Sequence, residues 1–271
     1  MLKKRIIFTL LYDEGSFMLS RNFRLQKVGG LDWLKRNYVF SRITLAIDEL
    51  IVLDVSRGER KIEAFTECLA ALTEECFIPI TAGGGVRSVE DARRLFTSGA
   101  DKIVINTALF TRQDEVRKIV SLYGGQAVVA SLDVKLTSEG YEVRVKNGGH
   151  PVEGLLAKSI RMALSLGVGE IYLYSIDRDG TGQGLDMEML DALPPDIPVP
   201  LILTGGVGKS SHFLEGLRDG RVDAVATANL FNFVGDGLCR VREELLSEGV
   251  DLPCWNGEAS ESLRNIFRRA N

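Results

Sequence analysis

The chain has 271 residues, a length that fits either two small domains or one α/β barrel of roughly 250 residues. Its 45% hydrophobic residues are typical of a globular enzyme, and its net charge of −4 without a long Lys/Arg run argues against nucleic acid or an anionic membrane as a partner. No apolar run reaches the roughly 18 residues of a membrane span, and the first residues lack a signal-peptide pattern, so we expect a cytoplasmic protein. With two histidines and no paired-cysteine motif, we expect neither a metal nor a cofactor.

Short apolar runs recur along the chain and predict eight strands, at residues 6–11, 50–54, 78–82, 102–106, 127–133, 171–175, 201–204 and 223–227. Amphipathic stretches between them predict helices, for example at residues 61–75, 88–98, 112–122, 154–166 and 208–218. Nearly continuous apolar strands that alternate with helices are typical of a buried parallel sheet. Residues 136–149 alternate around a glycine and predict a small hairpin inserted after the fifth strand.

The second half of the chain repeats the first at an interval of 121 residues, which separates Gly85 from Gly206 and Phe110 from Phe231. Because this interval holds four strands and four helices, the repeated unit is a half-barrel. We therefore predict a single (β/α)8 TIM barrel of the α/β class, built from two duplicated half-barrels over residues 1–250. Residues 251–271 form a carboxyl-terminal extension. A doubly wound open sheet would not predict the repeat.

Glycine-rich loops follow the third and seventh strands, at equivalent positions of the two halves. The amides of a glycine loop that precedes a helix can approach an anion without interference from a Cβ atom. Each loop alone is as consistent with a tight βα turn as with phosphate binding. Their duplication favours two facing phosphate sites, which the loops after the fourth and eighth strands complete. The candidate residues are Gly84, Gly85, Asn106 and Thr107 in the first half and Gly205, Gly206, Ala228 and Asn229 in the second.

Asp133 ends the fifth strand, where catalytic side chains of barrel enzymes emerge. Its carboxylate suits a general acid or base, and a structural cap is the alternative. Because the first strand is the equivalent of the fifth in the other half-barrel, we would expect a second carboxylate there. Neither Leu11 nor Tyr12, the two residues that align with Asp133, supplies one.

The loop after the sixth strand, residues 175–184, gathers acids, an arginine, a threonine and glycines at the same end of the barrel. We expect Asp179, Gly180 and Thr181 to contact phosphate or ribose hydroxyls, and a solvated acidic loop is the alternative. Asp54, which ends the second strand, is a further candidate for ligand contact.

Charged residues of alternating sign stand at the starts of four strands, so their side chains should gather at the other end of the barrel. They are Arg5, Glu49, Lys102 and Glu170. As surface ion pairs they would contribute only about 0–1 kcal/mol each. A charged ring around the axis can instead gate a passage through the barrel.

The sequence resembles the HisF family, the cyclase subunits of imidazole glycerol phosphate synthase, over about residues 1–248. The matching segments are 4–7, 48–50, 83–85, 100–102, 105–108, 126–129, 175–181 and 205–206. The resemblance implies a HisH-like glutaminase subunit docked at the bottom of the barrel, with Asp101 in the interface. It also implies ammonia passing the charged ring to a small-molecule substrate with a phosphate at each end.

The departures from the family concern its catalytic residues. The family uses two catalytic aspartates, of which the second matches Asp133 and the first is replaced by Leu11. A lysine of the first loop is replaced by Leu19. At the end of the first strand the chain is more similar to a branch with a Leu-Leu run, associated with bacterial surface polysaccharides. That resemblance implies ammonia delivery toward an acetamidino group on a sugar, with a separate amidotransferase.

Three functions follow from these observations. Leu11 favours ammonia delivery from a glutaminase to a phosphorylated acceptor in sugar amidination. Asp133 and the two glycine loops favour an authentic cyclase (lyase) of histidine biosynthesis. A barrel that only scaffolds and activates a glutaminase is the non-catalytic alternative.

Overall fold

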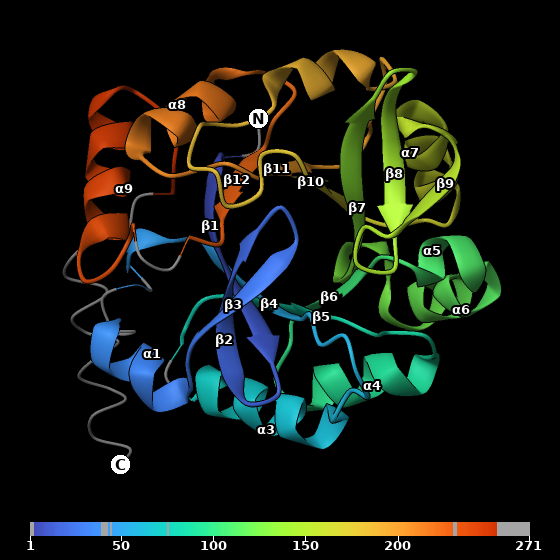
Figure 1. Ribbon diagram of the computed structural model, residues 1–271, viewed down its shortest axis with the longest axis horizontal. Coiled ribbons are helices and arrows are strands. Elements are labelled where there is room, and N and C mark those ends of the chain that lie inside the picture. Colours follow the sequence, from blue (N-terminus) through green and yellow to red (C-terminus); the bar gives the residue numbers. More distant parts are fainter. Residues whose placement is uncertain (1–2, 39–42, 44, 75, 230–231, 254–271) are drawn as a thin grey trace.

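A computed structural model of the protein describes residues 3–38, 43, 45–74, 76–229 and 232–253. Parallel strands close into a barrel within this part of the chain (Figure 1). They are β1 (Arg5–Asp13), β4 (Glu49–Asp54), β5 (Ile80–Gly83), β6 (Lys102–Ile105), β7 (Val128–Thr137), β10 (Glu170–Ser175), β11 (Leu201–Thr204) and β12 (Ala224–Thr227). Each pairs in parallel with the next, and the barrel closes where Arg5 of β1 lies beside Ala224 of β12. The predicted (β/α)8 barrel is confirmed.

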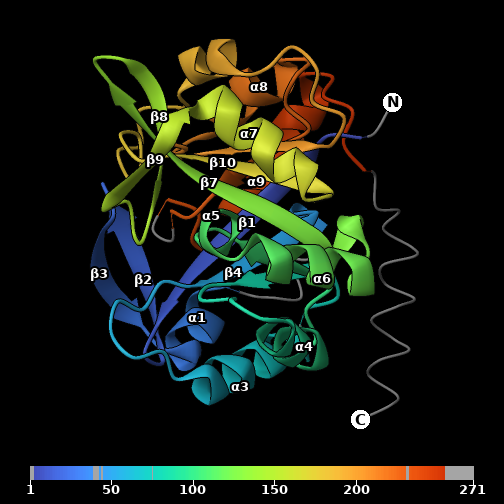
Figure 2. The ribbon, with the colours of Figure 1, turned by 90° about the vertical axis from the view of Figure 1, so that its right-hand side faces the viewer.

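Helices surround the barrel (Figures 1 and 2). They are α1 (Leu31–Asn37), α3 (Ile62–Thr73), α4 (Val89–Thr97), α5 (Ala108–Thr111), α6 (Gln113–Tyr123), α7 (Leu156–Ser165), α8 (Ser210–Arg218) and α9 (Gly237–Ser247), with short 3-10 turns η1 (Gly125–Ala127) and η2 (Met187–Ala192). In α3 the buried residues Phe65, Leu69 and Leu72 are spaced four and three apart, so they share the face that packs on the strands. No helix in the described segments is long and apolar enough to cross a bilayer.

The core has two parts because the strands are covered on both faces. Alternate residues point to opposite sides of a strand, so Ile6 packs in the outer layer under the helices while Ile7 packs inside the barrel. The inner cluster also contains Ile51, Val129 and Tyr172. Burial on both faces explains why the strands are continuous apolar runs in the sequence.

The two half-barrels repeat each other in their hydrogen bonds. At the start of β5, the Ile80 amide donates to the Asp101 carboxylate at 2.8 Å. At the start of β11, in the second half, the Leu201 amide donates to the Asp223 carboxylate at 2.9 Å. The duplication seen in the sequence therefore extends to the contacts that anchor equivalent strands. Residues 254–271 of the expected carboxyl-terminal extension, and Phe231 of the repeat, lie outside the described residues.

A hairpin that is not among the predicted elements follows β1. The chain turns at Glu14 and Gly15, both with positive φ, into β2 (Ser16–Arg21) and β3 (Arg24–Gly29). β2 pairs antiparallel with β1 and with β3. The turn between β2 and β3 places Asn22 and Phe23 at φ of 49° and 60°, a left-handed conformation that suits tight hairpin turns. We call these two strands the β2–β3 hairpin.

A second antiparallel extension follows the fifth barrel strand. β7 continues beyond the barrel to Thr137, and β8 (Gly140–Val145) and β9 (His150–Leu155) add to it in succession. Lys146 and Asn147, with φ of 53° and 59°, begin the turn between β8 and β9. In Figure 2 both extensions lie on the left, at the carboxyl end of the barrel strands, and the amino terminus lies on the right. Both extensions therefore cover the end at which a barrel holds its ligand.

Candidate functional site

Two cavities open at the carboxyl end of the barrel. The first has a volume of about 450 Å³ and contains Gly84, Gly85, Asn106 and Thr107 in its lining. The second has a volume of about 250 Å³ and is lined in part by Gly205, Gly206, Ala228 and Asn229. Each cavity therefore holds one of the two predicted glycine loops together with its companion loop, and the equivalent residues of the two half-barrels form equivalent surfaces.

The glycines of these loops are required by close backbone packing. Gly84 has a φ of 107°, and a Cβ atom there would collide with the carbonyl of Asp54. Gly206 has a φ of 89°, and a Cβ atom there would collide with the carbonyl of Gly184. Helices α4 and α8 begin a few residues after the two loops. Both loops thus bring bare backbone to a helix amino terminus, an arrangement that suits anions.

The companion loops are held by their own side chains. In the first cavity the side-chain amide of Asn106 donates to the carbonyl of Ser131 at 3.0 Å, and Thr107 Oγ1 accepts a hydrogen bond from the backbone N–H of Lys146 at 3.3 Å. In the second cavity the backbone N–H of Asn229 donates to Thr227 Oγ1 at 3.3 Å. The hydrogen bond from Lys146 to Thr107 places the β8–β9 turn against the first glycine-loop site. This contact could not be predicted from the sequence.

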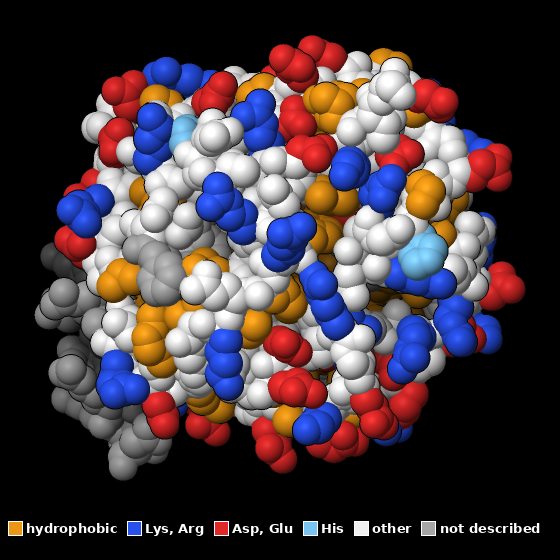
Figure 3. Space-filling view, in the orientation of Figure 1, with side chains coloured by type: hydrophobic (Ala, Val, Ile, Leu, Met, Phe, Trp, Pro, Cys, Tyr) orange, Lys and Arg blue, Asp and Glu red, His pale blue; other side chains and the backbone are white. Residues whose placement is uncertain are grey.

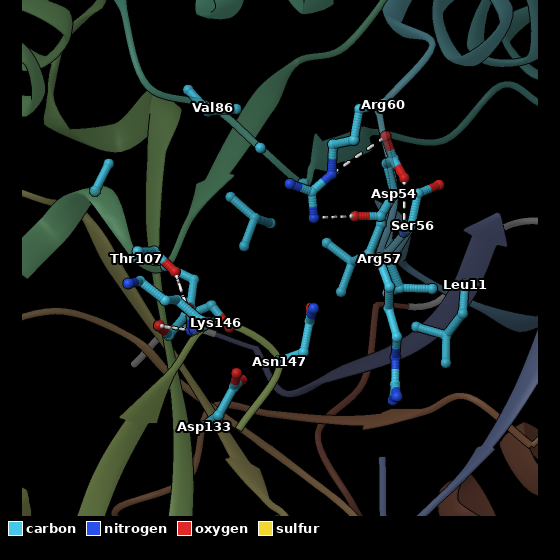
Figure 4. A pocket seen from close by; sticks show the side chains of 18 of the residues that line it. Leu11, Asp54, Ser56, Arg57, Arg60, Val86, Thr107, Asp133, Lys146 and Asn147 are labelled. Carbon is cyan, nitrogen blue, oxygen red and sulfur yellow. Dashed lines mark hydrogen bonds and ion pairs between the residues drawn. The ribbon is translucent and has the colours of Figure 1, made fainter. Parts of the chain in front are cut away.

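Asp133 and Leu11 both line the first cavity (Figure 4). Burial away from water, the largest cause, raises the pKa of Asp133 to about 7, and the nearby charge of Asp179 adds to the rise. A hydrogen bond from Asn106 acts in the opposite direction. A carboxyl group that titrates near neutral pH is suited to acid or base catalysis. Leu11, only 2% exposed, presents no group that exchanges a proton.

Asp179 is engaged with the β2–β3 hairpin. Its carboxylate, 3% exposed, accepts hydrogen bonds from the hydroxyls of Ser20 and Tyr174 and, at 2.8 Å, from the Phe23 amide. Burial and the Asp179 charge hold the pKa of Tyr174 well above its ordinary value, so its hydroxyl stays protonated and donates. The predicted ligand residue is therefore also the anchor of a hairpin over the barrel mouth.

The neighbours of Asp179 differ in position. Gly180 lines the second cavity, whereas Thr181 lines neither cavity and donates its hydroxyl to the Arg178 carbonyl at 2.8 Å. Asp54 lies in the first cavity, where its carboxylate accepts the Ser56 amide at 2.9 Å and lies 3.5 Å from Arg60 Nε.

The first cavity is also lined by basic side chains that are not among the predicted site residues. They come from the loop after β4, the loop between β5 and α4, the junction of α5 and α6, and the β8–β9 turn. These residues are Arg57, Arg60, Arg87, Arg112 and Lys146. Figure 3 shows Lys and Arg side chains gathered around a hollow on this face of the molecule. The segment Ser-Arg-Gly-Glu-Arg, one residue after the end of β4, is the sequence feature that could have indicated two of these basic residues.

The four charged residues at the amino end form a closed ring of ion pairs. Arg5 pairs with Glu170 and, at 2.8 Å, with Glu49. Lys102 bridges the same two carboxylates, at 2.9 Å to Glu49 and 2.8 Å to Glu170. Both glutamates are nearly inaccessible to water, and Thr81 donates its hydroxyl to Glu49 as well. Alternating charges therefore meet on the barrel axis and are not dispersed surface pairs. Asp101 lies at the same end, outside the ring, on the amide of Ile80.

Metal ligands are lacking in the described segments, where no three His, Cys, Asp or Glu side chains are grouped to hold an ion. The site as described consists of two glycine-loop cavities, one carboxyl group of raised pKa, and basic side chains on one side of the mouth. Such a site can bind a ligand with an anionic group at each end and move a proton near one of them.

The closed parallel barrel, its internal repeat and its two matched glycine loops define the class of duplicated (β/α)8 barrels. Residues 40–236 match a protein family described as "Histidine biosynthesis protein". A Parasynechococcus marenigrum (strain WH8102) protein, named provisionally as imidazole glycerol phosphate synthase subunit hisF2, is 48% identical over 94% of this chain and 95% of its own length. The imidazole glycerol phosphate synthase subunit HisF of Chlorobium phaeovibrioides (strain DSM 265 / 1930) is 36% identical over 92% of this chain and 98% of its own. The chain belongs to the HisF family of barrels, of the imidazole glycerol phosphate synthase cyclase type.

Proposed function

We propose that this barrel receives ammonia from a HisH-like glutaminase docked at its amino end, with Asp101 in the interface, and uses it on a phosphorylated substrate at its mouth. The reaction we favour is amidination of a sugar for surface polysaccharide, with a separate amidotransferase completing the transfer. The observation that carries this proposal is the combination of an intact ion-pair ring with Leu11 in the place of a catalytic carboxylate.

The residues that follow Leu11 along the chain do not replace the missing carboxylate in the described structure. Tyr12 points into the outer core, where its ring lies 5.2 Å from that of Phe65. Asp13 and Glu14, the nearest acids along the chain, line neither cavity. A positioned acid or base typically contributes 10²–10⁴-fold to a rate, so a cyclisation that needs two such groups should be strongly impaired with one.

An authentic cyclase of histidine biosynthesis is the second candidate. It is favoured by Asp133, whose pKa of about 7 fits general acid–base catalysis, and by the two glycine-loop cavities. The same cavities argue against a scaffold that merely activates a glutaminase, since such a scaffold has no need of a ligand-sized mouth.

The cyclase reaction itself separates these functions. The purified barrel, supplied with ammonium and the substrate of the histidine-pathway cyclase, should form no imidazole glycerol phosphate above background. Turnover close to that of an ordinary cyclase would disprove the proposal.

The variant Leu11→Asp tests whether one missing carboxylate is the obstacle. We expect it to gain cyclase turnover by about 10²-fold or more, because it restores a second proton-transfer group opposite Asp133. Leu53→Asp is the matched control, since Leu53 pairs with Leu11 in the β1–β4 register and lines the same cavity. Gain in both variants, or in neither, would show that the position of the carboxylate on β1 is not what limits the reaction.

A further inference from the structure

The first cavity carries an excess of positive charge. Five basic side chains line it, namely Arg57, Arg60, Arg87, Arg112 and Lys146, against two acidic ones, Asp54 and Asp133. Arg60 is paired with Asp54. The other four basic groups form no ion pair with any residue in the described part of the chain. Cations that outnumber the acids around a concave site indicate an anionic ligand.

One of these cations reaches the centre of the mouth, and a second lies on the side of the cavity formed by the Thr107 loop. In Figure 4, Arg57 extends alongside Leu11, and Asn147 lies between them and Asp133. The Arg57 guanidinium also donates to the Phe23 carbonyl of the β2–β3 hairpin, which holds it at the cavity. The backbone of Lys146 is held at the cavity because its N–H donates a hydrogen bond to Thr107 Oγ1 at 3.3 Å. At the position facing Asp133 the cavity thus offers an apolar side chain and a cation.

The second cavity is less positive. Its basic residues are Arg21 and Arg24, and its acid, Asp179, already accepts three hydrogen bonds from the protein. The two glycine loops are equivalent, so the difference between the cavities comes from the added side chains. A phosphate monoester dianion is matched by loop amides and one or two cations. The first cavity has more cations than such a group requires.

We propose that the first cavity binds a diphosphate, so that the substrate is a diphosphate ester of the nucleoside diphosphate class. A volume of about 450 Å³ lies within the range of sites that enclose ligands larger than a phosphate. The assignment rests on the proposed function only in that both require a phosphorylated ligand at the mouth. It names the anionic end of that ligand and leaves the ammonia chemistry unchanged.

Binding of inorganic pyrophosphate and inorganic phosphate to the full chain, by isothermal titration calorimetry at equal ionic strength, tests the assignment. Pyrophosphate should bind at least about 10-fold more tightly than phosphate. Arg57→Gln and Lys146→Gln should each weaken pyrophosphate about 5- to 10-fold and phosphate less than about 2-fold, because the first phosphate keeps the glycine loop. Both side chains are exposed, so the fold should survive, which a thermal midpoint verifies.

Arg94→Gln is the matched control. Arg94 lies on α4 outside the cavity and is paired with Glu63 and Glu90, so its loss should change neither affinity. Equal affinity for the two anions would overturn the diphosphate assignment and leave the proposed function standing. An equal loss in the control would attribute the affinity to general surface charge and overturn it too. Absence of binding by both anions would count against both proposals. If the assignment holds, ADP, GDP, UDP and CDP should each bind more tightly than the corresponding monophosphate.

Discussion

At the scale of single residues, the environment of Asp133 determines its chemistry. The carboxyl group lies on β7 at the carboxyl end of the barrel, and the loss of hydration outweighs the hydrogen bond from Asn106. Its pKa of about 7 therefore lies above the value near 3.8 of an unfolded chain. The protonated form is stabilised by folding, so the group's contribution is fully present below pH 3.8 and is lost as the pH rises through about 7.

The variant Asp133→Asn should accordingly stabilise the free protein at alkaline pH. We expect a gain of about 1–2 kcal/mol in the free energy of unfolding at pH 8, shrinking toward zero at acidic pH, measured by urea denaturation. The control Asp196→Asn changes an exposed carboxylate and should leave the pH dependence as it is in the parent. A gain of the same size at both ends of the pH range would mean that burial of the charge is not the cause.

Candidate site residues at strand ends and in glycine turns could be predicted from the sequence. The cations that the loops contribute to the cavity could not. Asp133 and Gly84 could be predicted to lie at the mouth because the end of an apolar run and a glycine turn leave local patterns. Arg57 and Lys146 occupy loops composed largely of polar residues and glycine. Which of them turns toward the cavity depends on how β2–β3 and β8–β9 pack over the mouth, and that packing joins segments far apart in the chain.

At the scale of elements, the β2–β3 hairpin shows how one contact can place a whole segment. Gly180 has a φ of 65°, and a Cβ atom there would collide with the Ser20 carbonyl of β2. This hairpin could not be predicted from the sequence because its turns use Glu14, Asn22 and Phe23 at positive φ, with no Asn-Gly or Asp-Gly pair to indicate them.

Gly180→Ala should therefore displace the hairpin. We expect faster amide hydrogen exchange across residues 16–29 and a loss of about 2 kcal/mol or more in stability, from backbone strain plus the collision. Gly182→Ala is a matched control, because Gly182 has a φ of 66° and nothing within 4 Å of a Cβ atom. It should show the strain alone, about 1 kcal/mol, with unchanged exchange in the hairpin. Identical exchange in the two variants would refute the role of this contact.

At the scale of the whole molecule, the barrel could be predicted because its signal is repeated. The interval of 121 residues between Gly85 and Gly206 and the continuous apolar runs both follow from a closed sheet buried on both faces. The charges at the strand starts also indicated a ring. Its closure, with Lys102 shared between Glu49 and Glu170, depends on distances across the barrel axis that one sequence does not contain.

The ring should be costly to break on one side. Lys102→Met leaves two nearly inaccessible carboxylates with Arg5 as their remaining ring cation, so we expect a loss of about 3 kcal/mol in the free energy of unfolding. Arg218→Met removes an exposed pair with Glu248 and should cost less than about 1 kcal/mol. Chemical denaturation of both variants gives the comparison, and similar small losses would place the ring among ordinary surface pairs.

Tyr174 and Ser20 line both cavities, so the mouth is divided by a partition made of a barrel strand and a hairpin. If each cavity binds an anion as we propose, two separate small anions are expected to bind the molecule together. When the same two groups belong to one ligand, binding of the first places the second at an effective concentration in the millimolar range, provided that the linker spans the partition. On this proposal the barrel selects its ligand by length as well as by charge, and a ligand with too short a linker is expected to fill one cavity and leave the other to a second copy.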